Sequence, residues 1–252
     1  MVLLPVHSTL SQDKDSSHAI LLKTETGEPD RFEWFNLGQD GLMGDTAQQP
    51  LPTLKETHLA LFSSFLKHGQ SVVATVSSAI AKQLSLPPDT FTALQEPTRP
   101  SAFASPASED VRTSMVHHTD FGTITLLANV IGGLQSLAPG RSPTDDSAWL
   151  WVRPRPGCLV VNLGDAIVQW TGGLLRSNVH RIQHSPDAQR FIDRYSLALL
   201  VRPERNASMR SLIGDAKDIN DCKLTAWEWE VRKAMALTRG DTVMQSKGGI
   251  GY

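Results

Sequence analysis

Three residues of the chain have the types and the spacing to bind one transition-metal ion together. His118 and Asp120 form a His-x-Asp pair, and on a β-strand the side chains at i and i+2 share a face, so both can point at one ion. A third imidazole, His180, lies in another strand-like run much later in the chain. Two histidines and one carboxylate on a β scaffold are the ligands of the facial triad of non-haem iron, which leaves positions open for a bidentate co-substrate and O₂. The sequence therefore predicts Fe(II) bound by His118, Asp120 and His180.

Other interpretations of these residues stay open at this stage. An isolated His-x-Asp pair is commonly a surface or turn pair, and a zinc site can use the same ligand set. His117 and His184 lie one and four residues from the preferred ligands and are alternative ligands. No residue near the three ligands has the pattern of a dedicated general base, which disfavours a zinc hydrolase. We predict no catalytic residue beyond the iron ligands.

An Arg-x-Ser pair follows the second histidine. Arg194 and Ser196 share one face if their segment is a strand. A guanidinium grips a carboxylate with two parallel hydrogen bonds, and a neighbouring hydroxyl adds another. The pair is thus predicted to bind the far carboxylate of 2-oxoglutarate while the 2-oxo acid end chelates the metal. A surface arginine is the alternative interpretation for an isolated Arg-x-Ser.

The segments that must position these side chains are mainly strands. Residues 1 to about 50 are polar and irregular, whereas the chain beyond residue 111 has short β-branched and aromatic runs separated by Gly, Pro or Asp-Ser. Many short strands with turn signals between them indicate a sandwich or barrel, and a jelly roll fits their number. The predicted strands cover residues 123–128, 134–137, 149–152, 158–162, 166–170, 177–182 and 195–201.

Helices are predicted on either side of this β-rich region. Apolar residues fall at helical spacing over residues 54–84, with an expected break at Gly69, and helical character returns over 224–237. Asp89 is expected to cap a short helix that begins at Thr90. The order helix, β-rich core, helix predicts an α+β protein whose core is a double-stranded β-helix (jelly roll) with flanking helices.

Composition favours a small-molecule substrate. The net charge is -2 and the pI is about 6.4, so nothing indicates a nucleic-acid or anionic-membrane partner. Cys158 and Cys222 form neither a disulfide framework nor a zinc-site spacing. The apolar run at residues 1–7 is too short for a signal-peptide core, and no stretch approaches the ~20 apolar residues of a membrane span. A cytosolic protein is expected.

Five blocks, in order, resemble the catalytic core of the isopenicillin N synthase-like 2-oxoglutarate/Fe(II) oxygenases, in the style of fungal members that tailor secondary metabolites. The order of the blocks is more specific than any one of them. They are residues 112–127 with the His-x-Asp pair, 157–165 as a glycine-flanked strand and turn, 169–173, 176–182 with the distal histidine, and 194–196 with Arg-x-Ser. Residues 31–38 and the helix after them also resemble the family's N-terminal region.

The resemblance implies a division of the chain and a chemistry. It implies a shortened N-terminal helical region at 1–110, a catalytic core at 111–205 and a C-terminal helical extension at 206–252. It also implies Fe(II), 2-oxoglutarate and O₂ as cofactor and co-substrates, and oxidation of an unactivated C–H bond by hydroxylation, desaturation or cyclisation. A hydrophobic substrate of terpenoid, polyketide or alkaloid type is expected.

Two departures from the family pattern keep alternatives open. The initial strand-helix-strand unit is absent or unrecognisable, and the strand rich in Leu, Arg and Tyr before the His-x-Asp segment is missing around residues 98–109. A homologous protein partner that completes the fold, a non-catalytic copy, or a mis-spliced gene product would each explain this. A related Fe(II) oxidase that uses no 2-oxoglutarate is a further alternative, because Arg-x-Ser can bind a substrate carboxylate.

Overall fold

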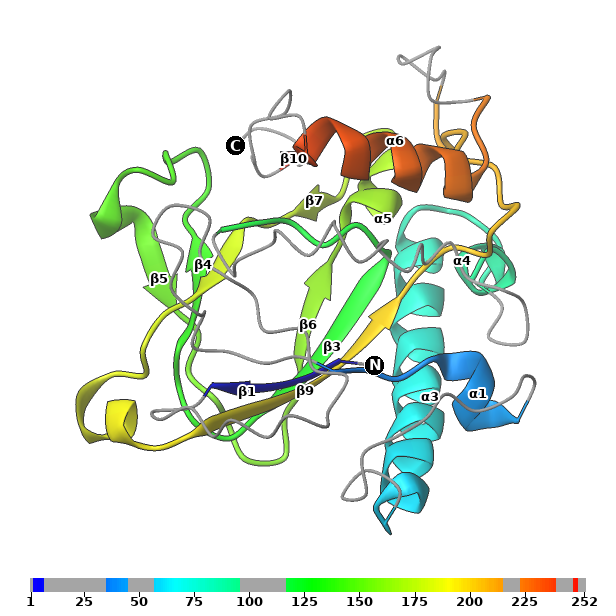
Figure 1. The fold of residues 1–252 in the computed structure, drawn as a ribbon. Coiled ribbons are helices and arrows are strands. Elements are labelled where there is room, and N and C mark those ends of the chain that lie inside the picture. The colour runs from blue at the N-terminus through cyan, green and yellow to red at the C-terminus, as the bar shows by residue number, and fades with distance from the viewer. Residues whose placement is uncertain are drawn as a thin grey trace.

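The computed structural model describes residues 2–6, 35–44, 57–95, 117–214, 223–238 and 247–248. Their strands form a five-stranded, a three-stranded and a two-stranded sheet, and a long helix lies beside the largest sheet (Figure 1). The strands are β1 (Val2–Val6), β2 (Phe35–Asn36), β3 (Ile124–Asn129), β4 (Leu134–Leu137), β5 (Trp149–Trp151), β6 (Val160–Leu163), β7 (Arg176–Ser177), β8 (His180–Ile182), β9 (Arg194–Val201) and β10 (Lys247–Gly248). The helices are α1 (Gln39–Met43), α3 (Leu59–Gln83), α4 (Thr90–Ala93), α5 (Asp165–Trp170), α6 (Ala226–Thr238) and the 3-10 turns η1 (Asp146–Ala148) and η2 (Asp187–Phe191).

The five-stranded sheet is antiparallel, in the order β2-β1-β9-β3-β6. Its pairing register places Thr125 of β3 between Asn162 of β6 and Leu200 of β9. Further along the same strands, Asn129 pairs with Ser196. Because side chains alternate between faces with a period of two, Thr125 and Asn129 share one face of this sheet.

The opposite face of this sheet packs on α3. Leu66 and Val73 of the helix form a buried cluster with Ile124, Leu126 and Leu199 of the sheet. The pattern of β3 thus divides its residues between a helix-covered face and the face that carries Thr125. The expected α+β jelly-roll arrangement is confirmed, and α3 confirms the predicted long helix.

The helix α3 runs without a break, so the predicted interruption at Gly69 is wrong. Gly69 is buried, and a Cβ placed there would lie 2.7 Å from Cδ2 of Leu199. The glycine therefore serves the close approach of helix and sheet. The predicted short helix at Thr90 is present as α4, although the Asp89 side chain makes no capping hydrogen bond.

The three-stranded sheet has the order β5-β4-β8. Its register places Leu150, Ser136 and His180 in one row across the three strands. The predicted strand over 177–182 is divided into β7 and β8, which belong to different sheets. His180 therefore begins its own strand, directly opposite Ser136.

The predicted strand at 166–170 is wrong, because residues Asp165–Trp170 form the helix α5. Ala166, Ile167, Val168 and Trp170 are all buried, so no polar face reveals a helical period. A short continuous apolar run is compatible with a buried strand or a buried helix alike. The helix packs below α6 in a second core (Figure 1), which contains Ala81, Phe91, Ala166, Ile167, Trp170, Ala207, Met209, Ala226 and Trp229.

The N-terminal region contributes a strand that the sequence did not reveal. Val2–Val6 form β1, which pairs antiparallel with β9 on the side away from β3. Residues 98–109, where the strand before the His-x-Asp segment is missing from the family pattern, and Cys222 lie outside the described residues. Cys158 is an exposed free thiol. Among the helices that the structure describes, none is both long and apolar enough to cross a membrane.

Candidate metal centre

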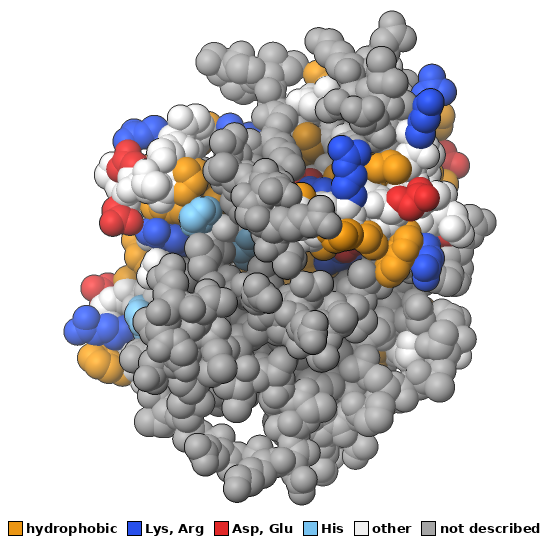
Figure 2. Space-filling view, turned by 45° about the horizontal axis from the view of Figure 1, so that its top comes forward, with side chains coloured by type: hydrophobic (Ala, Val, Ile, Leu, Met, Phe, Trp, Pro, Cys, Tyr) orange, Lys and Arg blue, Asp and Glu red, His pale blue; other side chains and the backbone are white. Residues whose placement is uncertain are grey.

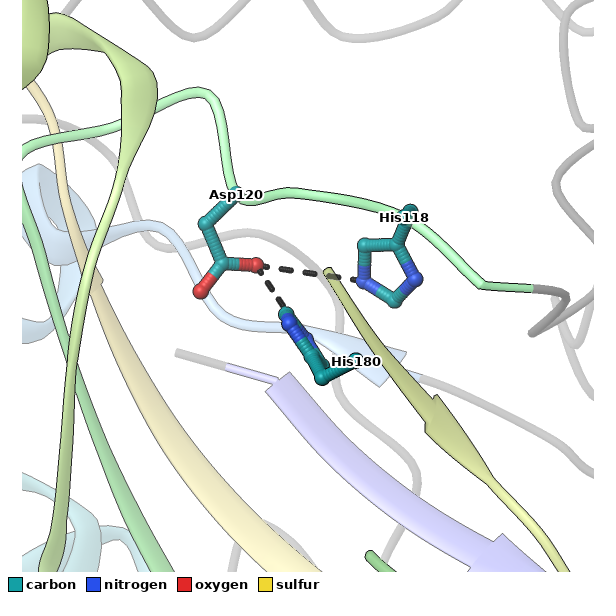
Figure 3. Close-up of side chains that lie close together, drawn as sticks. All are labelled: His118, Asp120 and His180. Carbon is teal, nitrogen blue, oxygen red and sulfur yellow. Dashed lines mark ion pairs between the residues drawn. The ribbon is translucent and has the colours of Figure 1, made fainter. Parts of the chain in front are cut away.

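The three predicted metal ligands lie together. One ligand atom from each of His118, Asp120 and His180 can be chosen so that all lie within 4.8 Å of one another. The Nε2 atoms of His118 and His180 are 3.8 and 3.7 Å from Oδ1 of Asp120. The two imidazole rings have centroids 4.3 Å apart, and all three side chains point toward one another (Figure 3). This arrangement places two imidazole nitrogens and one carboxylate oxygen around a common point.

Backbone pairing sets the distance between the two histidines. His118 and His180 form an antiparallel bridge, and each backbone N–H donates to the other's carbonyl oxygen at 2.9 Å. Nδ1 of His180 lies 3.2 Å from the carbonyl oxygen of Asn178. A proton on Nδ1 donates to that oxygen and leaves Nε2 with a free lone pair for a metal ion.

The carboxylate of Asp120 is held as an anion. Burial raises the pKa of Asp120, but His180 and His118 in their protonated, metal-free form oppose that effect. Hydrogen bonds from Thr125 and Asn162 add to the opposition, and the net result is a pKa below the ordinary 3.8. Nδ2 of Asn162 donates to Oδ2 at 2.7 Å. A charged carboxylate with one oxygen already bonded is suited to bind a cation through the other oxygen.

The three side chains remain partly accessible. Their exposed fractions are 24% for His118, 11% for Asp120 and 18% for His180. Histidine side chains reach the surface beside hydrophobic and basic side chains on the face drawn in Figure 2. A two-histidine, one-carboxylate set occupies one side of a metal ion and leaves its other positions for exogenous ligands.

The second predicted pair lies inside the protein. Arg194 and Ser196 of β9 are 3% and 2% exposed. Nε of Arg194 donates to the carbonyl oxygen of Gly132 at 2.9 Å. Both Nη atoms of Arg194 and Oγ of Ser196 are buried without a hydrogen-bond partner among the described residues. Burial lowers the pKa of Arg194 to about 10, so the guanidinium keeps its charge at neutral pH.

These unpaired polar groups indicate which kind of ligand they can bind. A buried donor without a partner costs about 1–3 kcal/mol, and more when it is charged. A carboxylate would accept from both Nη atoms at once and from the hydroxyl. The residues present therefore fit the distal carboxylate of a dicarboxylic acid.

The metal cluster and the Arg194 pair share one face of the five-stranded sheet. Thr125, which hydrogen-bonds Asp120, and Asn129, which pairs with Ser196, lie on the same face of β3. At roughly 3.3 Å per residue, these two positions are about 13 Å apart along the strand.

The two alternative histidines are not part of the cluster. The ring of His117 lies beside Trp149, with centroids 6.1 Å apart. Burial and then the charge of Arg181 lower its pKa. His184 is exposed. Among the described residues, the group with ligand atoms close enough for a metal contains neither.

The residue that hydrogen-bonds Asp120 from the neighbouring strand was not singled out from the sequence. Asn162 was recognised only as part of a glycine-flanked strand and turn. A polar Asn-x-Gly-Asp run at the end of an otherwise apolar strand was the available sign that this segment has a role beyond the fold.

Comparisons with known proteins agree with this geometry. Residues 98–203 match the 2OG-Fe(II) oxygenase superfamily. The chain is 30% identical over 215 residues to the 2-oxoglutarate-dependent dioxygenase gloE of Glarea lozoyensis, over 82% of this chain and 60% of that protein. It is 29% identical over 249 residues to the 2-oxoglutarate-dependent dioxygenase frbH of Dothideomycetidae sp., over 93% of this chain and 74% of that protein.

A solved structure shares the fold. Neurospora crassa T7H, crystallised in complex with alpha-KG, superimposes with a TM-score of 0.57 at 21% identity, over 74% of this chain and 64% of that chain. The chain thus spans less than two thirds of both the gloE protein and the T7H chain.

Proposed function

This chain belongs to the 2OG-Fe(II) oxygenase superfamily, and from that premise we propose that it oxidises a small organic molecule with Fe(II), 2-oxoglutarate and O₂. One observation carries the proposal. A buried arginine with two unpaired nitrogens, Arg194, lies beside an unpaired buried hydroxyl, on the same sheet face as a cluster of two histidines and one carboxylate. The two halves of the site match the two ends of a 2-oxo diacid.

Each residue has a defined role in this proposal. His118, Asp120 and His180 hold ferrous iron, and Asp120 uses the oxygen that Asn162 leaves free. Arg194 and Ser196 bind the distal carboxylate of 2-oxoglutarate. When bound, iron supplies O₂ activation coupled to decarboxylation of 2-oxoglutarate to succinate and CO₂. The protein positions the reactants and limits the access of water.

The substrate is proposed to be hydrophobic. Leu150 lies in the same row as Ser136 and His180, and residues in one row share a face of the sheet. The Leu150 side chain is 55% exposed, so an apolar side chain lies on the same sheet face as a metal ligand, two strand spacings or about 10 Å away. Hydroxylation, desaturation or cyclisation of a secondary metabolite of terpenoid, polyketide or alkaloid type is the proposed reaction.

A cytosolic location completes the proposal. The exposed Cys158 is a free thiol, which is the state that a reducing compartment maintains. Two alternatives are carried with it: an Fe(II) oxidase that uses no 2-oxoglutarate, and a non-catalytic homologue or one that needs a homologous partner to complete its fold.

The test is coupled turnover. The chain is incubated with Fe(II), 2-oxoglutarate, O₂ and a panel that contains terpenoids, polyketides, alkaloids and free amino acids. Succinate and oxidised product formed in equal amounts support the proposal. Product without succinate identifies the oxidase. If the iron-loaded chain forms neither product nor succinate, the chain is not active by itself. Activity that is restored only by a homologous partner supports the partner-dependent alternative. Turnover of amino acids alone contradicts the hydrophobic substrate.

Two variants connect this turnover to the structure. Arg194→Gln removes the guanidinium from the buried site, and the matched control Arg190→Gln removes one that is exposed and stacked on Phe191. Only the first is expected to raise the 2-oxoglutarate concentration that half-maximal turnover requires.

A further inference from the structure

A buried carboxylate that is not a metal ligand lies directly behind the metal cluster. Asp165, the first residue of α5, is 2% exposed. Its Oδ2 accepts a hydrogen bond from Oγ1 of Thr119 at 3.1 Å, and its Oδ1 accepts one from Oγ of Ser177. Its Oδ2 also forms an ion pair with Nζ of Lys233 in α6. One side chain thus joins four separate segments of the chain.

The contact with Thr119 acts on the His-x-Asp segment. Thr119 is 3% exposed and lies between His118 and Asp120 in the chain, and the side chains of these two ligands point toward His180 (Figure 3). In addition, the backbone N–H of Asp165 donates to the carbonyl oxygen of Asp120 at 2.8 Å. Asp165 therefore holds this segment from behind by a side-chain and a backbone hydrogen bond.

The contact with Ser177 acts on the other ligand segment. Ser177 is fully buried in β7 and precedes His180 by three residues. Since Thr119 and Ser177 donate to different oxygens of one carboxylate, Asp165 links the segments that carry all three ligands. This link adds a second connection to the backbone bridge that already joins His118 and His180.

The partner of Asp165 comes from the C-terminal helix. The Lys233 ammonium lies 4.8 Å from the ring of Phe121 and 4.4 Å from that of Trp229, which favours its charge. Removing one member of a buried ion pair strongly destabilises the folded protein, because the other charge stays buried without its partner. Lys233 thus ties α6 to the residue that supports the metal cluster.

The approach of α5 to this segment is unusually close. A Cβ on Gly164 would lie 2.2 Å from the carbonyl oxygen of Gly122 and 2.9 Å from that of Asp120. Real Cβ atoms do not reach such distances, so only glycine permits the turn that brings Asp165 behind the ligands. The backbone turn at Gly164 therefore fixes the position of Asp165.

We propose that Asp165 is a positioning residue that holds His118, Asp120 and His180 in metal-binding geometry, and that Lys233 couples α6 to the metal centre through it. This inference deepens the proposed function and rests on it only in requiring that the cluster binds a divalent metal. Residues that orient metal ligands typically change metal affinity about 10–100-fold when mutated.

The experiment measures Co(II) dissociation constants by absorption titration, and thermal midpoints of the metal-free proteins, on the full chain. The variants are Asp165→Asn, Lys233→Met, their double mutant, and Thr119→Val with Thr119→Ser as its conservative partner. Thr119→Val removes a hydroxyl and no charge, so it separates positioning from a change in electrostatic potential. Asp145→Asn, in an exposed ion pair with Arg141, is the matched control.

If Asp165 positions the ligands, Asp165→Asn should bind Co(II) about 10–100-fold more weakly than the wild type. Thr119→Val should also bind Co(II) more weakly. Thr119→Ser retains most of the affinity, and Asp145→Asn binds like the wild type. Lys233→Met also weakens binding, and the double mutant loses less than the sum of the two single changes because both act through one contact.

The overturning results are distinct. If Asp165→Asn lowers the thermal midpoint but Asp165→Asn and Thr119→Val bind Co(II) like the wild type, Asp165 is only structural and the positioning role fails. If Asp165→Asn alone loses affinity, the effect is electrostatic and the positioning role fails as well. If the wild-type chain binds no Co(II), the metal centre fails, and the proposed function fails with it.

Discussion

Nδ2 of Asn162 donates to Oδ2 of Asp120 at 2.7 Å, while Oδ1 of the same carboxylate faces both histidine rings. One oxygen is therefore occupied by the protein and the other is directed at the metal position. Since Asn162 and Thr125 pair in register on neighbouring strands, the sheet places two hydrogen-bonding partners of Asp120 side by side.

Replacing Asn162 by leucine tests this relationship. Asn162→Leu removes the hydrogen bond at similar side-chain volume, so Asp120 can rotate and its pKa rises. We expect metal affinity to fall about 10–100-fold, as measured by metal titration. Asn206→Leu, at an exposed position, is the control. Unchanged metal affinity in Asn162→Leu would show that the Asp120 carboxylate is oriented by other contacts.

The assignment of the two histidines predicts a difference between ligands and neighbours. His118→Ala and His180→Ala each remove one of three ligands and should abolish stoichiometric iron binding. His184→Ala should leave binding intact, because His184 is exposed and outside the cluster. Iron content after anaerobic loading and desalting is the measurement. Iron retained by His180→Ala and lost by His184→Ala would mean that the distal ligand is wrongly assigned.

The buried guanidinium of Arg194 is expected to lower the stability of the protein without 2-oxoglutarate and to be required for 2-oxoglutarate binding. In Arg194→Met the two unpaired buried nitrogens disappear, and the carbonyl oxygen of Gly132 loses one of its two donors but still accepts from Oγ of Ser185. The thermal midpoint without 2-oxoglutarate should equal or exceed that of the wild type, since an unpaired buried charge costs more than a neutral group of similar shape. Added 2-oxoglutarate should raise the midpoint of the wild type only. A variant midpoint that rises with 2-oxoglutarate would remove Arg194 from the co-substrate site.

The hydrogen bonds at the N-terminal end of α6 predict that the stability of the fold depends on pH. Glu228 accepts from the backbone N–H and hydroxyl of Thr225, whose Oγ1 accepts from the Glu228 N–H, a reciprocal capping box. The backbone hydrogen bond and then the side-chain one lower the pKa of Glu228 below 4.5. A lowered pKa means that the cap stabilises the fold fully above pH 4.5 and that this contribution is lost as the pH falls through the folded pKa.

Thr225→Ala tests the cap. The substitution should cost about 1 kcal/mol of stability at neutral pH. In an NMR titration the pKa of Glu228 should rise toward, but not reach, 4.5, because the backbone N–H of residue 225 still donates. A pKa unchanged by the substitution would show that the hydroxyl contributes nothing to the cap.

Much of the site was predictable because its signals are local or ordered along the chain. His118, Asp120 and His180 follow from residue type, i and i+2 spacing and the order of blocks, and the structure brings them together. Arg194 and Ser196 share a face for the same reason. The long helix α3 and the final helix α6 follow from apolar periodicity.

What could not be predicted depends on contacts between distant segments. Nothing in the spacing of Asp165 and Lys233 indicates that they form an ion pair. The pairing of β1 with β9 joins the two halves of the chain across a separation that periodicity does not reach. The strand predicted at 166–170 is the helix α5 because complete burial removes the amphipathic pattern that distinguishes the two structures.

The visible spectrum of the anaerobic protein with Fe(II) and 2-oxoglutarate tests the central claim most directly. A 2-oxo acid that chelates ferrous iron gives a weak metal-to-ligand charge-transfer band. We predict this band for the wild type, its loss in His118→Ala and Asp120→Ala, and a higher 2-oxoglutarate concentration for half-saturation in Arg194→Gln. A folded wild-type chain that shows no band at saturating Fe(II) and 2-oxoglutarate would contradict the account.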